Sequence, residues 1–173
     1  MKNDPALFSA TELLGADQKK TLSPVEVTKA TLARIEKFNP KFNAFRLVDA
    51  EKALADAKAS EERWIKGEPA GLVDGVPSTI KDLVDTIGWS TRRGSLTTSD
   101  NGTSENDAPL VARLRENGAV LLGKTTTPEF GWKGVTDSPL TGITRNPWNP
   151  EKTPGGSSGG AAAAAAACLG ALH

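Results

Sequence analysis

The segment that most restricts how this chain can fold is TPGGSSGGAAAAAAA, residues 153–167, in which glycine and serine lead directly into alanine. Glycine loses more conformational entropy on ordering than any other residue, so an ordered run of this kind requires an unusual backbone path or a close approach. Alanine is the strongest helix former. We therefore expect an ordered loop at 155–160 that leads into a helix from about Ala161. This helix has almost no polar face and is expected to be buried.

Three interpretations of the glycine-serine run are open from the residues alone. It matches the first half of a phosphate-binding loop, G-x-x-x-x-G, but Ala161 and Ala162 stand where that loop needs Lys and Ser or Thr. The second interpretation is a flexible linker, and burial of the following helix argues against it. The third is a serine site for nucleophilic chemistry, which needs a base beside the serine.

Without a histidine partner, the base must be Lys, Asp or Glu, and Lys81 is the candidate that the sequence favours. The only histidine, His173, is the last residue and is expected to fray into solvent, so a histidine-based triad has no partner. Lys81 ends an apolar stretch that contains Val76 and Ile80, and a lysine held among apolar groups loses its preference for the charged form. A surface lysine is the alternative interpretation of Lys81.

Composition excludes several classes of protein. The 173 residues carry 21 basic and 21 acidic side chains with no run of Lys or Arg, which gives no general attraction to nucleic acid or to an anionic membrane. The single cysteine, Cys168, excludes an intrachain disulfide and, with only one histidine, a zinc shell. No apolar signal segment follows Met1, and the apolar run 161–169 is too short to span a bilayer. We expect a soluble cytoplasmic protein with no metal and no cofactor.

Helices are expected to dominate the first seventy residues. Ser23-Pro24-Val25-Glu26 is a capping box, and apolar residues recur behind it at helical spacing until Asn39-Pro40, where the helix is expected to stop. These apolar residues are Val25, Leu32, Ile35 and Phe38. Asp49 is expected to cap a second helix from Ala50 to Lys66, which Gly67 ends.

The remaining residues predict alternating strands and helices. A short strand at 76–81 is followed by a helix at 107–117 and by the uninterrupted apolar run 119–122, which fits a strand covered on both faces. Thr127-Pro128-Glu129 has the chemistry of another helix start. Residues 131–156, rich in Gly, Pro, Asn and Thr, predict a long ordered loop. This order of elements indicates an α/β fold.

Three stretches together resemble the amidase signature hydrolases. GVPSTIKDLVDTIGWSTRRGS (75–95) resembles the family's lysine segment, DAPLVARLRENGAVLLGKTTTPEF (107–130) its next helix and strand, and RNPWNPEKTPGGSSGGAAAAAA (145–166) the signature itself. Their ordered occurrence covers essentially the whole chain. The resemblance implies the N-terminal part of an α/β/α fold, with a mixed central sheet and the leading helices packed on the outside.

The resemblance also implies a Ser–cis-Ser–Lys triad that cleaves amide bonds through an acyl-enzyme. Lys81 matches the family's lysine, the ultimate proton acceptor, and Ser157 matches the bridging serine, which a cis peptide bond joins to Gly156. Ser158 is the alternative for the bridging role. Gly131, like Ser157, matches a position that lies against the substrate. The family's nucleophilic serine and oxyanion hole belong to a further glycine-rich segment that this chain does not include.

We therefore expect residues 1–173 to form one partial amidase domain that stops before the nucleophile segment, with a helical region at about 1–70 and the start of the α/β core at about 71–173. Three functions are open: an amidase acting on a small or aryl/alkyl carboxamide, the A subunit of a tRNA-dependent amidotransferase that releases ammonia from glutamine, and a non-catalytic fragment that binds a partner. The expected ligand is a small-molecule amide, without direct contact to nucleic acid or a membrane. A homodimer is one expectation for the full-length enzyme, and the chain alone is expected to be inactive.

Overall fold

Three strands form the sheet on which the other elements pack. The computed structural model describes residues 4–100 and 102–173. In it the strands β1 (Phe45–Val48), β3 (Val120–Thr125) and β2 (Pro77–Lys81) lie side by side in that order. The central strand β3 runs antiparallel to β1 and parallel to β2. The mixed sheet expected from the resemblance is therefore confirmed.

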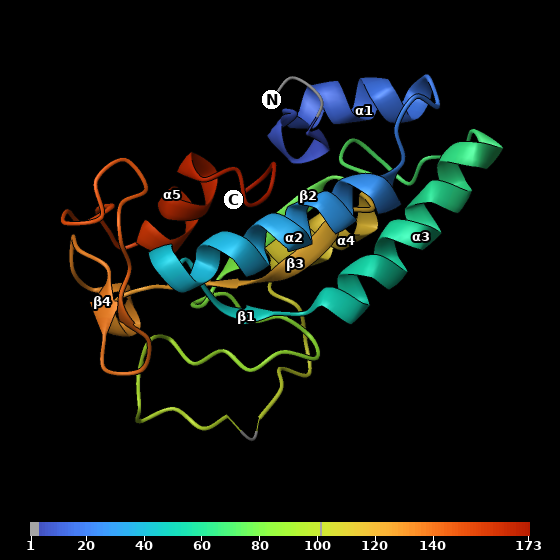
Figure 1. Ribbon diagram of the computed structural model, residues 1–173. Helices are drawn as coiled ribbons and strands as arrows, with labels where there is room; N and C mark the ends of the chain where they lie inside the picture. Colours follow the sequence, from blue (N-terminus) through green and yellow to red (C-terminus); the bar gives the residue numbers. More distant parts are fainter. Residues whose placement is uncertain (1–3, 101) are drawn as a thin grey trace.

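The central strand β3 is covered on both faces, as its apolar run predicts. All six of its residues are buried. Val120 and Leu122 pack in one cluster with residues of α2 (Pro24–Phe42), α3 (Ala50–Lys66) and α5 (Gly159–Ala166). Leu121 packs on the opposite face against Val111 of α4 (Pro109–Glu116). Figure 1 shows this layering, with α2 and α4 on opposite sides of the sheet. Helix, sheet and helix thus form three layers.

The N-terminal helices begin at the residues that local capping chemistry favours. A 3-10 turn η1 (Pro5–Leu7) and helix α1 (Ala10–Gln18) precede α2. Ser23 and Glu26 form the predicted capping box at the start of α2. Asp49 accepts a hydrogen bond from the backbone N–H of Lys52 at the start of α3, and Gly67 ends that helix in a left-handed conformation. The second predicted helix, residues 50–66, is confirmed at both ends.

One expectation for this region is wrong, and one strand lies within it. Helix α2 does not stop at Asn39-Pro40 but continues to Phe42, with Pro40 inside its last turn, and ends at Asn43 with a φ of 52°. A proline in the last turn removes only one helical hydrogen bond, and the continuation buries Phe42 in the core. Strand β1 also interrupts the helical region. Its four residues have no alternating pattern, and pairing with β3 makes them a strand.

The second half contains the loops that surround the site. The predicted start of a helix at Thr127-Pro128-Glu129 yields only one 3-10 turn, η2 (Glu129–Gly131). Phe130 and Gly131 have φ values of 50° and 69°, and a left-handed backbone cannot continue a right-handed helix. The long loop that follows is ordered and contains a small hairpin of β4 (Asp137–Ser138) and β5 (Gly142–Ile143).

The alanine helix α5 begins two residues earlier than predicted and is buried on one face only. Ala163 and Ala164 lie in the core, whereas Ala162, Ala165 and Ala166 are exposed. A helix that packs on a sheet buries one side, and alanine tolerates solvent on the other.

The C-terminal residue His173 is ordered, contrary to the expectation that it frays. Its Nδ1 lies 3.0 Å from Thr79 Oγ1, and its Nε2 lies 3.2 Å from the Gly170 carbonyl oxygen. Among the described residues, none of the helices combines the length and the apolar character that crossing a membrane requires.

Candidate active site

Lys81 lies at the carboxyl end of β2, where the strand leaves the sheet. Its register partner is Thr125 of β3, and the next backbone N–H, that of Asp82, donates to the Thr125 carbonyl at 3.1 Å. The Lys81 Nζ donates to Ser157 Oγ at 2.7 Å and to Ser158 Oγ at 3.0 Å. Burial lowers the pKa of the Lys81 amine below its ordinary value. The contact expected between Lys81 and Ser157 is present, and Ser158 shares it.

The glycine-serine run forms an ordered loop that ends in α5. Gly155 has a φ of 92°, and the peptide bond between Gly156 and Ser157 is cis, as the resemblance implies. The Ser157 carbonyl oxygen accepts a hydrogen bond from Thr127 Oγ1 at 3.2 Å. Within the first turn of the helix, the Gly160 N–H donates to the Thr126 carbonyl at 3.2 Å. The loop is therefore bonded to the residues that immediately follow β3.

Glycine is required in this loop because other backbone segments approach it closely. A Cβ on Gly156 would lie 2.7 Å from the Val135 nitrogen and 2.8 Å from the Lys133 carbonyl oxygen. A Cβ on Gly160 would lie 2.4 Å from the Thr126 nitrogen. Real side chains do not make contacts this short with backbone atoms. The glycines thus bring the two serines next to the sheet edge, as the sequence argument anticipated.

A buried ionic network lies behind Lys81, on the side of the neighbouring Asp82. The Arg46 guanidinium of β1 donates to both carboxylate oxygens of Asp82, at 2.7 and 3.0 Å. The Lys124 Nζ of β3 lies 3.9 Å from the same carboxylate and donates to the Val84 carbonyl and to Thr91 Oγ1. Burial lowers the pKa of Lys124 to about 8, and the Asp82 carboxylate acts against that shift. This network joins all three strands at the edge from which Lys81 projects.

Gly131 lies in the turn after β3, four residues beyond Thr127. Its N–H donates to the Pro128 carbonyl at 2.8 Å, and a Cβ at this position would lie 2.5 Å from Leu83 Cδ1. The N–H of Phe130 donates to the Arg93 carbonyl at 2.7 Å. This turn is therefore bonded to the segment that follows Lys81.

Three residues support the site but are not among those predicted from the sequence: Arg46 and Lys124, which lie at the Asp82 carboxylate, and Thr136, whose hydroxyl donates to the Gly155 carbonyl. The only indication for Lys124 in the sequence is its position, as a charged residue at the end of an apolar strand. Arg46 carried no signal, since its partner Asp82 lies 36 positions away. Among the described residues, no group of three or more His, Cys, Asp or Glu side chains is placed to hold a metal ion.

Comparison with known proteins places this geometry in a family. A family model, Amidase, matches residues 26–172. An indoleacetamide hydrolase of Bradyrhizobium diazoefficiens is 41% identical over 165 residues, which cover 95% of this chain and 31% of that protein. The A subunit of the glutamyl-tRNA(Gln) amidotransferase of Geobacter metallireducens is 45% identical over 153 residues, which cover 87% of this chain and 31% of that protein.

Solved structures agree with the family match. A bacterial aryl acylamidase, described as belonging to the amidase signature enzymes, aligns with a TM-score of 0.85 and 36% identity over 91% of this chain and 33% of its own. The present chain spans about a third of the length of the curated relatives it matches. Because the family model extends from the first turn of α2 to residue 172, this chain belongs to the amidase signature family.

Proposed function

We propose that this chain supplies the lysine and the bridging serine of an enzyme that hydrolyses the C–N bond of a carboxylic amide. The observation that carries the proposal is the 2.7 Å separation between the Lys81 amine and the Ser157 hydroxyl. A neutral lysine amine at this distance can accept the hydroxyl proton directly. Partial burial of Lys81, which lowers its pKa, favours that neutral form.

In the proposed reaction Ser157 is a relay between Lys81 and a nucleophilic serine that a segment beyond residue 173 supplies. Ser157 Oγ accepts the proton of the attacking hydroxyl while its own proton moves to Lys81 Nζ. The nucleophile then bonds to the amide carbon, and the C–N bond breaks as the leaving amine takes a proton back along the same path. Water then bonds to the acyl carbon and gives its proton to the same relay. The acyl–oxygen bond breaks, the nucleophilic serine takes that proton back, and the carboxylic acid is released.

Two further residues have proposed roles. Ser158, whose hydroxyl also accepts from Lys81, is the alternative relay. Gly131 and Ser157 are proposed to lie against the substrate. The bond from Thr127 to the Ser157 carbonyl supports this proposal, since it joins the Ser157 loop to the start of the turn that contains Gly131.

The A subunit of a tRNA-dependent amidotransferase is the second candidate function, because a protein of that name is 45% identical to this chain. Both functions use the same proposed relay and differ in what the full-length protein binds. An amidase purified alone should hydrolyse an arylamide, whereas the amidotransferase protein should release ammonia from glutamine together with its partner subunits. For the full-length amidase we also propose a homodimer, which size-exclusion chromatography would test.

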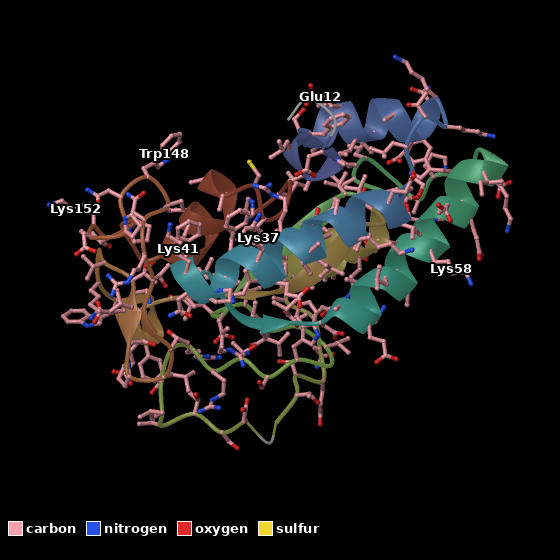
Figure 2. All side chains as sticks on the ribbon, in the orientation of Figure 1. Glu12, Lys37, Lys41, Lys58, Trp148 and Lys152 are labelled. Carbon is pink, nitrogen blue, oxygen red and sulfur yellow. The ribbon has the colours of Figure 1, made fainter. Side chains whose placement is uncertain are left out.

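The test is a set of substitutions in the full-length enzyme, assayed with p-nitroacetanilide. Lys81→Ala should lower turnover by about 10³-fold or more, since it removes the proton acceptor, and Ser157→Ala should lower it somewhat less. Lys58→Ala is the matched control. Figure 2 shows Lys58 on the outer side of α3, and Lys58 is exposed to solvent. This control should keep turnover within about two-fold of wild type.

Two results would contradict the proposal. Wild-type turnover in a folded Lys81→Ala enzyme would leave Lys81 as a structural residue. If Ser157→Ala stays active and Ser158→Ala instead shows the loss expected for Ser157→Ala, then Ser158 is the relay and Ser157 is not.

A further inference from the structure

The serine at the start of α5 does not cap its own helix. Ser158 occupies the N-cap position, where a serine hydroxyl ordinarily accepts a hydrogen bond from the backbone of the first turn. Within the described part of the chain, its side chain makes no such bond. Instead, the Ser158 hydroxyl accepts from Lys81 Nζ at 3.0 Å. The N-terminus of α5 therefore needs another acceptor.

The Thr126 carbonyl already accepts from the Gly160 N–H, and the first N–H of the helix, that of Gly159, is left to Thr136, a residue of the long loop before the signature. Its Oγ1 accepts a hydrogen bond from the Gly159 N–H at 3.1 Å and donates to the Gly155 carbonyl at 2.8 Å. One hydroxyl thus bonds to the backbone on both sides of Ser157 and Ser158. Among neutral aliphatic side chains only a hydroxyl can donate and accept through the same atom. Thr136 is 2% exposed and Gly159 is buried, so the Gly159 N–H has little access to water as a substitute.

The glycines of the signature permit this approach. A Cβ on Gly159 would lie 2.1 Å from Thr136 Oγ1 and 2.6 Å from Thr136 Cβ. A Cβ on Gly156 would lie 2.8 Å from the Gly134 carbonyl carbon. Residues 133–136 therefore lie directly against the serine loop, and two of its glycines face them.

Thr136 is itself held by the scaffold and not by the serine loop alone. Its carbonyl accepts a hydrogen bond from the Thr144 N–H at 2.9 Å. The Thr144 hydroxyl in turn donates to the Asn43 carbonyl at 2.9 Å, at the residue where α2 ends. The position of the Thr136 hydroxyl is thus set from outside the loop that it bonds.

We propose that Thr136 is a positioning residue of the amidase reaction: by bonding the backbone on both sides of the serine pair, it keeps both serine hydroxyls directed at Lys81. This inference rests on the proposed function. Without the Thr136 hydroxyl, the Gly159 N–H loses its acceptor, and the Gly155 carbonyl keeps only the longer bond from Thr153 Oγ1 at 3.5 Å. The backbone that carries the two serines is then no longer fixed on both sides. The Thr136 hydroxyl bonds backbone groups and neither hydroxyl of the serine pair, so its effect should be on turnover and not on binding.

The experiment compares three single variants of the full-length enzyme, with p-nitroacetanilide as substrate. Thr136→Val keeps the side-chain shape but lacks the hydroxyl, and kcat should fall about 10-fold or more with KM within about two-fold of wild type. Thr136→Ser keeps the hydroxyl and should retain at least about half of the wild-type kcat. Thr31→Val is the matched control, because it removes another buried threonine hydroxyl, whose partner is the Val27 carbonyl within helix α2. Its kcat should stay within about two-fold of wild type.

The outcomes separate this inference from the proposed function, because Lys81→Ala and Ser157→Ala are measured in the same assay. If both of those variants lose activity while Thr136→Val keeps the wild-type kcat, the inference on Thr136 alone is wrong. A Thr136→Ser enzyme as slow as Thr136→Val, a loss carried by KM, or an equal loss in Thr31→Val would also overturn it. If Thr136→Val does not fold, Thr136→Ala replaces it, since alanine lacks the hydroxyl and places no methyl group against the Gly155 carbonyl. Wild-type activity in Lys81→Ala would instead overturn the proposed function.

Discussion

At the scale of single residues, the charge state of Lys81 is the property on which the proposed chemistry depends. Its amine donates to two serine hydroxyls, and no carboxylate within salt-bridge distance stabilises its charged form among the described residues. Burial lowers its pKa below 10.5, so the neutral amine is present at a lower pH than for a lysine in water.

The pH dependence of hydrolysis follows from this charge state. A proton acceptor must be neutral, so kcat/KM of the full-length enzyme should rise with pH through the lowered pKa of Lys81 and fall as the pH drops below it. Initial rates over a series of buffers would measure the profile, with the folded state checked by circular dichroism at each pH. A rate that stays constant between about pH 9 and pH 5 would be inconsistent with Lys81 as the base.

At the scale of elements, α1 contains a buried carboxyl group that the proposed reaction does not use. Asp17 is 2% exposed, and neither of its carboxylate oxygens has a hydrogen-bond partner among the described residues. Burial, together with repulsion from Asp74 and Glu61, raises the pKa of Asp17 to about 7. The protonated, neutral form of Asp17 is therefore the one that is compatible with its burial in the folded protein.

Asp17→Asn should make the full-length enzyme more stable relative to wild type as the pH rises from about 4 to about 7. In this window Asp17 ionises in the unfolded chain but stays protonated in the folded one, so wild type loses stability at about 1.4 kcal/mol for each unit of pKa difference. Asparagine does not ionise and avoids this loss. Urea unfolding of both proteins at several pH values would measure the difference, and a constant difference would show that Asp17 ionises equally in both states.

At the scale of the whole molecule, this chain presents large apolar side chains around the loops of the site. Trp132 and Trp148 are 84% and 86% exposed, and Figure 2 shows Trp148 directed away from the body of the molecule. Exposed aromatic groups of this size are typical of surfaces that pack against other protein. This observation agrees with the comparison, in which the chain covers 31% of the length of two relatives.

Residues 1–173 expressed alone should have no amidase activity. The proposed relay is present, but the nucleophilic serine and the oxyanion-hole donors are proposed to lie in a later segment, and the donors alone are worth about 10²–10³ in rate. Assays with p-nitroacetanilide would compare residues 1–173 with the full-length enzyme. Turnover by the short chain that disappears in its Ser157→Ala variant would identify Ser157 as the nucleophile instead of a relay.

The sequence by itself determined the elements whose stability is local. The capping box at Ser23 and the Asp49 cap start their helices as predicted because their hydrogen bonds join residues three positions apart. The apolar run 119–122 indicated a strand covered on both faces, because successive side chains of a strand point to opposite faces and an uninterrupted run makes both faces apolar. Motifs that resemble a known family were enough to pair Lys81 with Ser157, although 76 positions separate them.

Only the tertiary structure decided the contacts that hold the site in place. Strand β1 exists because β3 pairs with it, and Asp82 is held by Arg46 from a strand 36 positions earlier. Thr136 caps α5 from 23 positions away, although Ser158 stands at the position that local rules assign to the cap. Neighbouring residues carry no signal for such bonds, because their free energy depends on where the packed scaffold places each partner.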